Sequence, residues 1–392
     1  MIILFTACVG LSVLGSSFFK IRLGPLSVIN IYMLWTMLYY LNSLVAAVRH
    51  RLRIKKETGY LFLFVCYAFI VVLLSYTGTL SAIFLNQVYV DYSYIPRQAY
   101  YLLFLPLPVI SALLWKPNKI AKFVLAKPER TAFLLYAAYC IYNQRIALAI
   151  PITLFLGACL LLVKSRTVST YILLFIVLFS PIGAGGEMTQ LILRFLVAAY
   201  FIFPNKSLRI NRIVWIGIAI VIAGSIISGP ILTRVVDGLD PNSLWRLQYW
   251  ADEMTLLAKS YGVGLGYGTS YASFDFLAYS GFGLEGGPFG ANSEYSGLEQ
   301  AFVTGSHNSM VSITYRLGII GLGLLMLFLS RCNRMLADAR ESLFVNLLFY
   351  GSIVICIFNV GFESPHYLFP FLMAVGLVCS LESIETYSTT NL

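Results

Sequence analysis

The amino-acid sequence predicts an all-α polytopic membrane protein, and three observations lead to that fold class. Hydrophobic residues make up 59% of the 392 residues and charged residues 11%, a composition far from that of soluble globular domains. Apolar stretches long enough to cross a bilayer as helices recur along the chain. The basic residues gather between these stretches, so the formal net charge of +10 reflects membrane topology and does not indicate nucleic-acid binding.

About twelve apolar segments are long enough, or nearly so, to span roughly 30 Å of hydrocarbon. Two of them, 129–142 and 190–203, are short and have polar neighbours, so about ten to twelve spans are expected. The first segment lacks the basic start and the cleavage site of a signal peptide, and we interpret it as a membrane helix. The segments are 2–19, 23–48, 59–80, 98–115, 129–142, 146–163, 168–185, 190–203, 213–230, 309–330, 342–360 and 367–382.

The orientation follows from the basic clusters, because short cytoplasmic loops collect Lys and Arg. Most of the 27 Lys and Arg residues fall in the clusters 49–56, 116–130, 164–166, 205–212 and 331–340. With about twelve spans, these clusters lie on the same, cytoplasmic side as both chain termini. The polar stretch between the ninth and tenth helices then faces outward. The chain therefore divides into transmembrane helices at 1–230, an outward loop at 231–309, and C-terminal helices with a short tail at 310–392.

The known motifs of several enzyme classes are missing from the sequence. It has no P-loop, no D-x-D, no H-E-x-x-H and no G-x-S-x-G in a suitable context, so nucleotide hydrolysis and metal or serine proteolysis are unsupported. The seven cysteines show no C-x-x-C pairing, so neither a zinc site nor a disulfide framework is indicated. No βαβ unit surrounds GVGLGYG at 262–268, and its glycines are expected to permit a tight turn or a close backbone approach. We expect no metal and no cofactor.

The outward loop contains one predicted helix. The turn that begins at Asp240 and Pro241 leads into it, and apolar residues at helical spacing from Leu244 to Leu257 predict an amphipathic helix at the membrane–water interface. The stretch 261–297 is rich in Gly, Ser, Tyr and Phe without a sustained period, which predicts a mobile loop.

Arginines in or near the outward loop are candidates for holding an oxyanion, because the planar guanidinium pairs two phosphate oxygens at once. Arg234 and Arg246 flank the start of the predicted helix and are expected to converge on a diphosphate. Arg145 and Arg194 fall at or within the expected hydrocarbon, where a charge costs at least about 2.5 kcal/mol, so each either lines a polar cavity or snorkels to an interface. Arg316 has a similar position and stays unassigned.

His307 is the best candidate for proton transfer, because it lies at the outer mouth of the next helix and imidazole titrates near neutral pH. A lone histidine at a helix entrance is otherwise usually structural. Glu363, in the outward loop FESPHY, is the second candidate. Trp250, Tyr249 and Asn308 are candidates for contact with a glycan, although interfacial anchoring accounts for the aromatic residues equally well.

The order and spacing of these motifs resemble the O-antigen ligase and Wzy-type O-antigen polymerase superfamily. The helix start NQRIALAI at 143–150 resembles the corresponding S-R-G-A-L-type start in that family. The motifs that carry the resemblance in the outward loop are R-x-x-x-W from Arg246 to Trp250, G-x-G-x-G from Gly262 to Gly266, His307-Asn308, and the L-G-I-I-G-L run at 317–322. Together they cover about a fifth of the chain, and the topology of about ten to twelve helices with one large late loop fits the remainder.

The resemblance implies a GT-C-like, metal-independent glycosyltransferase of the bacterial inner membrane, with its active site at the periplasmic face. Its substrate would be an undecaprenyl-diphosphate-linked oligosaccharide, and its partners would be membrane lipids and a polysaccharide chain-length regulator. By position, Arg145 and Arg246 would hold the diphosphate and His307 would activate the acceptor. Arg234 fits the family's other loop arginine, and Asn-Gln stands before Arg145 where the family often has a small hydroxyl residue.

Four functions are compatible with these features to different degrees. A polymerase, which joins lipid-linked repeat units for O-antigen, capsule or exopolysaccharide, is favoured over a ligase that moves the glycan to lipid A core. A lipid-linked oligosaccharide transporter would also need many helices, but transporters usually show two similar halves, whereas this chain concentrates its polar residues in one loop. The peptidoglycan polymerases have an acidic residue near the end of their loop where this chain has His307-Asn308.

Overall fold

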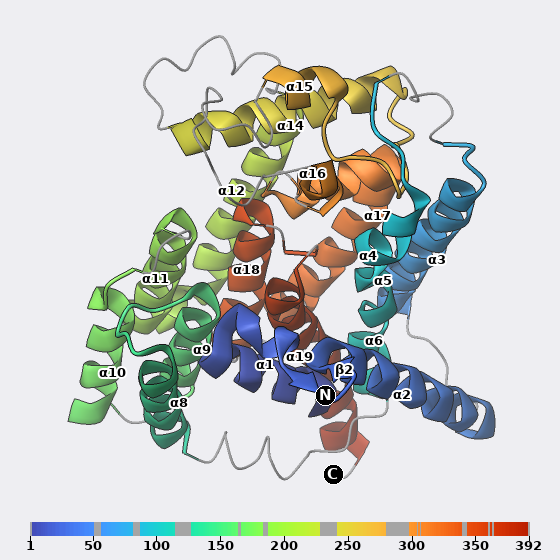
Figure 1. Ribbon diagram of the computed structural model, residues 1–392. Coiled ribbons are helices and arrows are strands. Elements are labelled where there is room, and N and C mark those ends of the chain that lie inside the picture. Colours follow the sequence, from blue (N-terminus) through green and yellow to red (C-terminus); the bar gives the residue numbers. More distant parts are fainter. Residues whose placement is uncertain are drawn as a thin grey trace.

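The structure, a computed structural model, is a bundle of α-helices with one short β-hairpin among the described residues (Figure 1). The hairpin strands Arg22–Leu23 and Leu26–Ser27 pair antiparallel. The predicted all-α class is therefore confirmed. The structure describes residues 2–50, 56–80, 87–113, 127–163, 166–182, 187–227, 241–279, 298–303, 305, 307–338, 343–359, 361–362 and 364–390.

The helices follow the apolar segments of the sequence. In the first half of the chain they are α1 (Ile2–Leu14), η1 (Gly15–Lys20), α2 (Val28–His50), α3 (Lys56–Tyr76), η3 (Tyr92–Tyr94), α4 (Ile95–Ala99), α5 (Tyr101–Phe104), α6 (Leu107–Leu113), α8 (Pro128–Asn143), α9 (Ile150–Leu161), α10 (Val168–Phe179) and α11 (Glu187–Ile202). In the second half they are η4 (Pro204–Lys206), α12 (Ser207–Ile227), α14 (Pro241–Lys259), α15 (Phe274–Tyr279), α16 (Leu298–Val303), α17 (Ser309–Asp338), α18 (Leu343–Phe358) and α19 (Pro365–Thr390).

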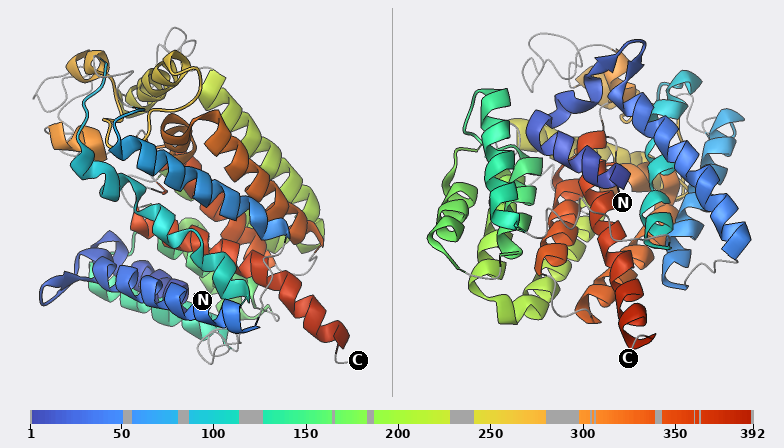
Figure 2. Two further views of the ribbon diagram at one scale, coloured as in Figure 1. Left: turned by 90° about the vertical axis from the view of Figure 1, so that its right-hand side faces the viewer. Right: turned by 90° about the horizontal axis from the view of Figure 1, so that it is seen from below.

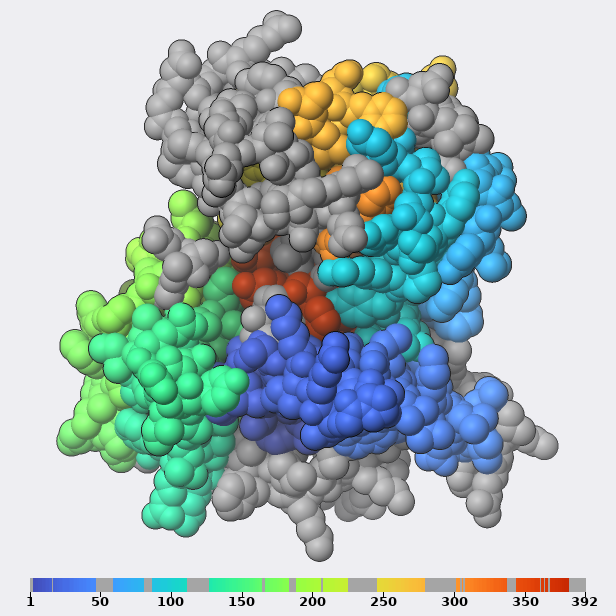
Figure 3. Space-filling model, in the orientation of Figure 1, coloured from blue at the N-terminus to red at the C-terminus, as the bar shows by residue number. Residues whose placement is uncertain are grey.

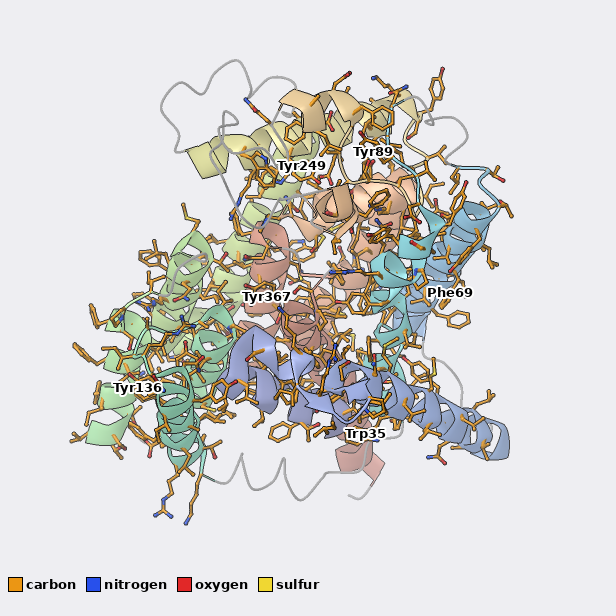
Figure 4. The ribbon with its side chains drawn as sticks, viewed as in Figure 1. Trp35, Phe69, Tyr89, Tyr136, Tyr249 and Tyr367 are labelled. Atoms are coloured by element: carbon orange, nitrogen blue, oxygen red, sulfur yellow. The ribbon has the colours of Figure 1, made fainter. Side chains whose placement is uncertain are left out.

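Among the described residues, 4 helices are long and apolar enough to cross a membrane, by length and composition: Val28–Ala46, Gly59–Tyr76, Ser207–Gly224 and Ser309–Leu336. Shorter apolar helices accompany them, such as Ile150–Leu161 and Leu343–Phe358. Large apolar side chains cover the outside of the bundle. Phe69 of α3 points away from it and is 47% exposed (Figure 4). Such a surface suits contact with lipid and would promote aggregation in water.

The segment predicted as one helix at 98–115 is instead divided into the short helices α4, α5 and α6. Pro106 and Pro108 explain the division between α5 and α6, because a proline has no N–H to donate to the preceding turn. The helix α5 accordingly ends at Phe104. The segment 2–19 similarly ends its α-helix at Leu14 and continues as η1.

The core of the bundle is built around α9, in which every residue from Ile150 to Leu160 is buried. A helix that is apolar on all sides belongs in the interior. Glycines let its neighbours approach closely: a Cβ on Gly157 would lie 2.5 Å from Val197 Cγ2 of α11, and a Cβ on Gly351 of α18 would lie 2.7 Å from Leu154 Cδ1. Figure 3 shows α1 and the start of α2 lying across one face of this bundle.

The helices α14 and α15 lie across one end of the bundle, over the ends of α12 and α17 (Figures 1 and 2). We call this the capped end. Hydrogen bonds between neighbouring helix ends place the start of α9, the end of α10, the start of α11, the start of α17 and the end of α18 there as well. The predicted helix of the outward loop is confirmed as α14.

Basic residues mark the opposite end of the bundle. Lys127 and Arg130 lie at the start of α8, Arg166 precedes α10, and Arg331 and Arg334 lie near the end of α17. The starts of α8 and α10 are joined there by a hydrogen bond from Thr170 Oγ1 to Glu129 Oε1 (2.6 Å). These five basic residues are thus separated from α14 by the length of the bundle (Figure 1).

The helix α17 is broken at Gly318, where φ is 69° and ψ is −174°. A break leaves backbone groups without their helical partners. The glycine loop, residues 262–268, supplies replacements: Leu265 N donates to Tyr315 O (2.9 Å), Gly266 N donates to Arg316 O (3.0 Å), and Ile319 N donates to Gly262 O (2.9 Å). The hydroxyl of Tyr67 on α3 donates to Leu317 O (2.9 Å). The first part of the predicted mobile loop is therefore paired with the backbone of α17.

Glycine is required on both sides of this contact. A Cβ on Gly318 would lie 2.3 Å from Val263 O, and a Cβ on Gly264 would lie 2.5 Å from Gly318 N. Both residues also have positive φ, of 69° and 93°, which other residue types rarely adopt. Gly264 and Gly318 therefore allow the backbones of the glycine loop and α17 to approach closely, in agreement with the close backbone approach that the sequence predicts.

We expect Gly318→Ala to lower the free energy of unfolding by about 3 kcal/mol or more, because the new Cβ meets backbone oxygen and the φ is strained. Gly323→Ala is the matched control on the same helix, since a Cβ there meets nothing within 4 Å. Thermal unfolding of both variants in detergent measures the difference. Equal melting temperatures for the two variants would contradict the broken helix.

Candidate functional site

The candidate site lies at the capped end, where α14 runs beside the first turns of α17. The ring centroids of Trp245 and His307 are 6.3 Å apart, and the rings are nearly perpendicular. One turn along α14, Tyr249 is fully buried and stacks on Phe276 of α15, with centroids 5.1 Å apart. Apolar residues three and four positions apart fix α14 to the helices below it, and Figure 4 shows Tyr249 in this layer.

Arg246 and His307 are brought together by this packing. Arg246 follows Trp245 on α14 and is partly buried, and its Nε makes no hydrogen bond to the part of the chain that the structure describes. Burial of His307 and, after it, the positive charge of Arg246 lower the pKa of the imidazole from 6.5 to about 4. The imidazole is therefore neutral at physiological pH. Two residues that sequence reasoning assigned to one site are thus electrostatic neighbours.

The backbone around His307 is fixed by the start of α17. His307 has a φ of 59°, in the left-handed region, and turns the chain into the helix. Asn308 is buried and caps that helix, because its Oδ1 accepts hydrogen bonds from Met310 N (3.1 Å) and Val311 N (3.3 Å). This capping role accounts for Asn308 in structural terms, whereas its predicted contact with a glycan stays a prediction.

A chain of hydrogen bonds, which we call the polar seam, links the start of α17 to the neighbouring helix ends. Ser309 Oγ accepts from Phe362 N (3.0 Å) and donates to Asn359 O (3.3 Å). Asn359 Nδ2 in turn donates to Thr189 Oγ1 at the start of α11 (2.9 Å). Phe362 directly precedes Glu363, but Glu363 itself lies outside the described residues, as does Arg234.

The polar seam continues to the helix end that carries Arg145. Gln190 Nε2 donates to Leu148 O (2.5 Å), and Leu148 N donates to Pro181 O (3.0 Å). Arg145 lies just before Leu148, after the left-handed Gln144, and its side chain is exposed. The seam therefore places Arg145 and His307 at the same end of the bundle.

Arg194 is buried, and its guanidinium is bonded to backbone. Its Nη1 donates to Leu178 O (2.9 Å) and its Nη2 donates to Ser180 O (2.7 Å), at the end of α10. A cation is favourable there, because the last carbonyls of a helix carry partial negative charge. These bonds explain why a charged residue is tolerated at this position, and its predicted role in diphosphate binding stays a prediction.

The aromatic candidates differ in accessibility. Tyr249 has 0% exposed surface and packs inside the cluster under α14, so in this conformation it presents no face to a glycan. Trp250 is partly buried at the edge of the same cluster. Between these two, Trp250 is therefore better placed to meet a sugar.

Two residues to which the sequence assigned no role, Asp252 and Arg316, also organise this end. The carboxylate of Asp252 accepts hydrogen bonds from Ser273 N (2.7 Å) and Ser273 Oγ (2.6 Å). These bonds connect α14 to residues 269–273, which follow the glycine loop. Burial raises the pKa of Asp252. Arg316, left unassigned from sequence, is buried over the ring of Tyr271 and donates from Nη1 to Gly266 O (3.0 Å). Among the described residues, no group of three or more His, Cys, Asp and Glu is placed to hold a metal ion.

The pKa of His307 gives a direct test of the site. We expect a histidine-labelled sample to show by NMR a His307 pKa near 4, and Arg246→Gln to raise that pKa toward 6.5, because the substitution removes a positive charge. Since the unfolded imidazole takes up its proton first, the fold should lose stability as the pH falls from 6.5 to about 4. Lys259→Gln removes a charge from the far end of α14 and is the control. A His307 pKa unchanged by Arg246→Gln would refute the electrostatic contact.

No known protein-family profile matches this chain, and comparisons with functionally curated proteins and with solved structures find no significant similarity.

Proposed function

We propose that this protein is a metal-independent glycosyltransferase that polymerises undecaprenyl-diphosphate-linked oligosaccharide repeat units at the periplasmic face of the bacterial inner membrane. The observation that carries the proposal is the electrostatic proximity of Arg246 to a neutral His307, which packs against the neighbouring Trp245 at the capped end of an apolar helical bundle. A cation for a diphosphate and a base for a hydroxyl thus occur together at one end of the bundle.

The proposed reaction needs few catalytic groups, because a glycosyl diphosphate already carries a good leaving group. The acceptor hydroxyl oxygen attacks the anomeric carbon, the bond from that carbon to the diphosphate oxygen breaks, and undecaprenyl diphosphate leaves with both electrons. Arg246 stabilises the charge that develops on the departing diphosphate. His307 takes the proton of the attacking hydroxyl. Attack from the face opposite the diphosphate inverts the anomeric centre, and a product of retained configuration would exclude this single displacement.

The other arginines fit this reaction to different extents. Arg145 is exposed at the same end of the bundle and suits contact with a diphosphate or a lipid headgroup. Arg194 has two of its nitrogens bonded to backbone carbonyls, so its contribution is to hold the end of α10 near Arg145. The experimental distinction is straightforward, because loss of Arg145 should weaken donor binding and loss of Arg194 should lower stability.

The polymerase assignment is tested by deleting the gene in its native strain and resolving surface glycolipids and lipid-linked intermediates by size. Loss of the long ladder, with a single repeat still attached to the core, supports a polymerase. An unextended core with long polymer on undecaprenyl diphosphate would indicate a ligase instead. Donor that accumulates on the cytoplasmic face would indicate a transporter.

In the complemented deletion strain, we expect Arg246→Ala and His307→Ala each to lower glycan transfer by about a hundredfold, because each removes one required charge or proton acceptor. Lipid-linked donor should then accumulate at the outer face. Lys259→Ala is the matched control, since it removes an exposed basic residue from the same helix, hydrogen-bonded to Gln87. Full transfer by either test variant at normal protein levels would exclude the assigned role.

A further inference from the structure

A buried glutamine far from the candidate site in sequence joins two segments that lead to it. Gln98, on α4, is 4% exposed. Its Nε2 donates to Thr269 O (3.0 Å) and to Phe302 O (2.8 Å), and its Oε1 accepts from Gly268 N (2.7 Å). One amide side chain therefore satisfies three buried backbone groups, from the glycine loop and its continuation on one side and from α16 on the other.

The two segments joined by Gln98 are in contact at further points. Tyr271 N donates to Ala301 O (2.8 Å), and the ring of Tyr94 stacks on Phe302 with centroids 4.7 Å apart. The stretch 268–274 also pairs with 87–91, through the bonds Asp91 N to Gly268 O (2.7 Å) and Ser270 N to Tyr89 O (2.8 Å). The helix α16 is thereby attached to residues 268–274, which directly follow the part of the glycine loop that is hydrogen-bonded to the break in α17.

The helix α16 ends at Val303, and the chain then reaches His307 within a few residues. His307 has the left-handed backbone described above, and α17 begins directly after Asn308. The backbone of His307 is therefore fixed on both sides, by the cap of α17 after it and by the hydrogen bond from Gln98 to α16 before it. The start of α17 is held by the polar seam, and α16 is held by Gln98.

We propose that Gln98 is a positioning residue for the glycosyl-transfer site, which fixes α16 to the glycine loop and so sets the place of His307 beside Arg246. The proposal rests on the proposed function for its catalytic meaning, but the positioning itself is independent of it. Gln98 contacts neither of the two candidate catalytic side chains and acts through the backbone of Phe302.

Glutamine is suited to this role because its amide offers two N–H donors and an acceptor oxygen in one plane. A hydrophobic residue of similar length offers none of these, and its introduction would leave Gly268 N, Thr269 O and Phe302 O buried without their partner. Each such group costs about 1–3 kcal/mol. We expect such a variant to shift α16 away from the glycine loop, and to shift His307, which follows α16 closely in the sequence, with it.

The test uses the full-length protein in detergent, with Gln98→Met and, as a second variant, Gln98→Asn, which keeps the amide but is one methylene shorter. Histidine-labelled samples report the His307 NMR resonance and its titration, and thermal unfolding confirms that each variant is folded. Transfer assays with purified lipid-linked donor separate kcat from KM. We expect the His307 pKa to move from about 4 toward 6.5, and kcat to fall at least about tenfold with little change in the KM for the donor.

The control is Asn211→Leu, which removes another buried amide, the acceptor for the hydroxyl of Tyr200 (2.5 Å) near the start of α12, outside both the polar seam and α16. It should leave the His307 resonance unchanged. An unshifted His307 resonance in a folded Gln98→Asn variant would overturn the positioning role. A shifted resonance with unchanged kcat would support the positioning role and count against His307 as the base, so failure of the inference and failure of the proposed function give different results.

Discussion

The break in α17 at Gly318 is the constraint on which the capped end depends. Within an apolar bundle an unpaired backbone N–H or C=O costs several kcal/mol, so a broken membrane helix persists where other groups replace its lost hydrogen bonds. The glycine loop does so along Tyr315, Arg316 and Ile319. A segment of the outward loop is thereby made part of the helical bundle. The helix α14, which carries Arg246, and the helix α16, which precedes His307, are then attached to that segment, through Asp252 with Ser273 and through Ala301 with Tyr271.

Five of the described arginines fall into two groups, according to whether the guanidinium is hydrogen-bonded to backbone carbonyls. Arg166, Arg194 and Arg316 each donate to at least one backbone carbonyl, at the end of a helix or at the break in one. Their charge is compensated by the partial negative charge of those carbonyls. Arg145 and Arg246 remain partly or largely exposed at the capped end. Because a guanidinium already bonded to backbone has fewer donors for a ligand, these two are the better candidates for binding an anion.

The helical segments could be predicted from the sequence because hydropathy and length determine them. The amphipathic pattern from Leu244 to Leu257 likewise identified α14, and the glycines at 262–268 indicated a close backbone approach. The backbone that the glycine loop approaches, at Gly318, could not be predicted, since nothing in the sequence distinguishes Gly318 from other glycines of an apolar helix. The break between α5 and α6 follows from Pro106 and Pro108, whereas hydropathy alone predicts one helix over 98–115. The roles of Gln98 and Asp252 depend on contacts between residues far apart in sequence, and no local pattern encodes them.

The low pKa of His307 has a consequence for the order of events under the proposed function. A base with a pKa near 4 is weak, because burial and the charge of Arg246 both oppose its protonation. A diphosphate bound at Arg246 brings negative charge that offsets the guanidinium, and each unit by which the pKa rises corresponds to about 1.4 kcal/mol in favour of the protonated imidazole. Under the proposed function, His307 would therefore be a stronger proton acceptor with the donor in place than without it. Without a bound donor, burial and the charge of Arg246 would keep the pKa of His307 low. His307 would then not activate an acceptor hydroxyl or water in the absence of donor.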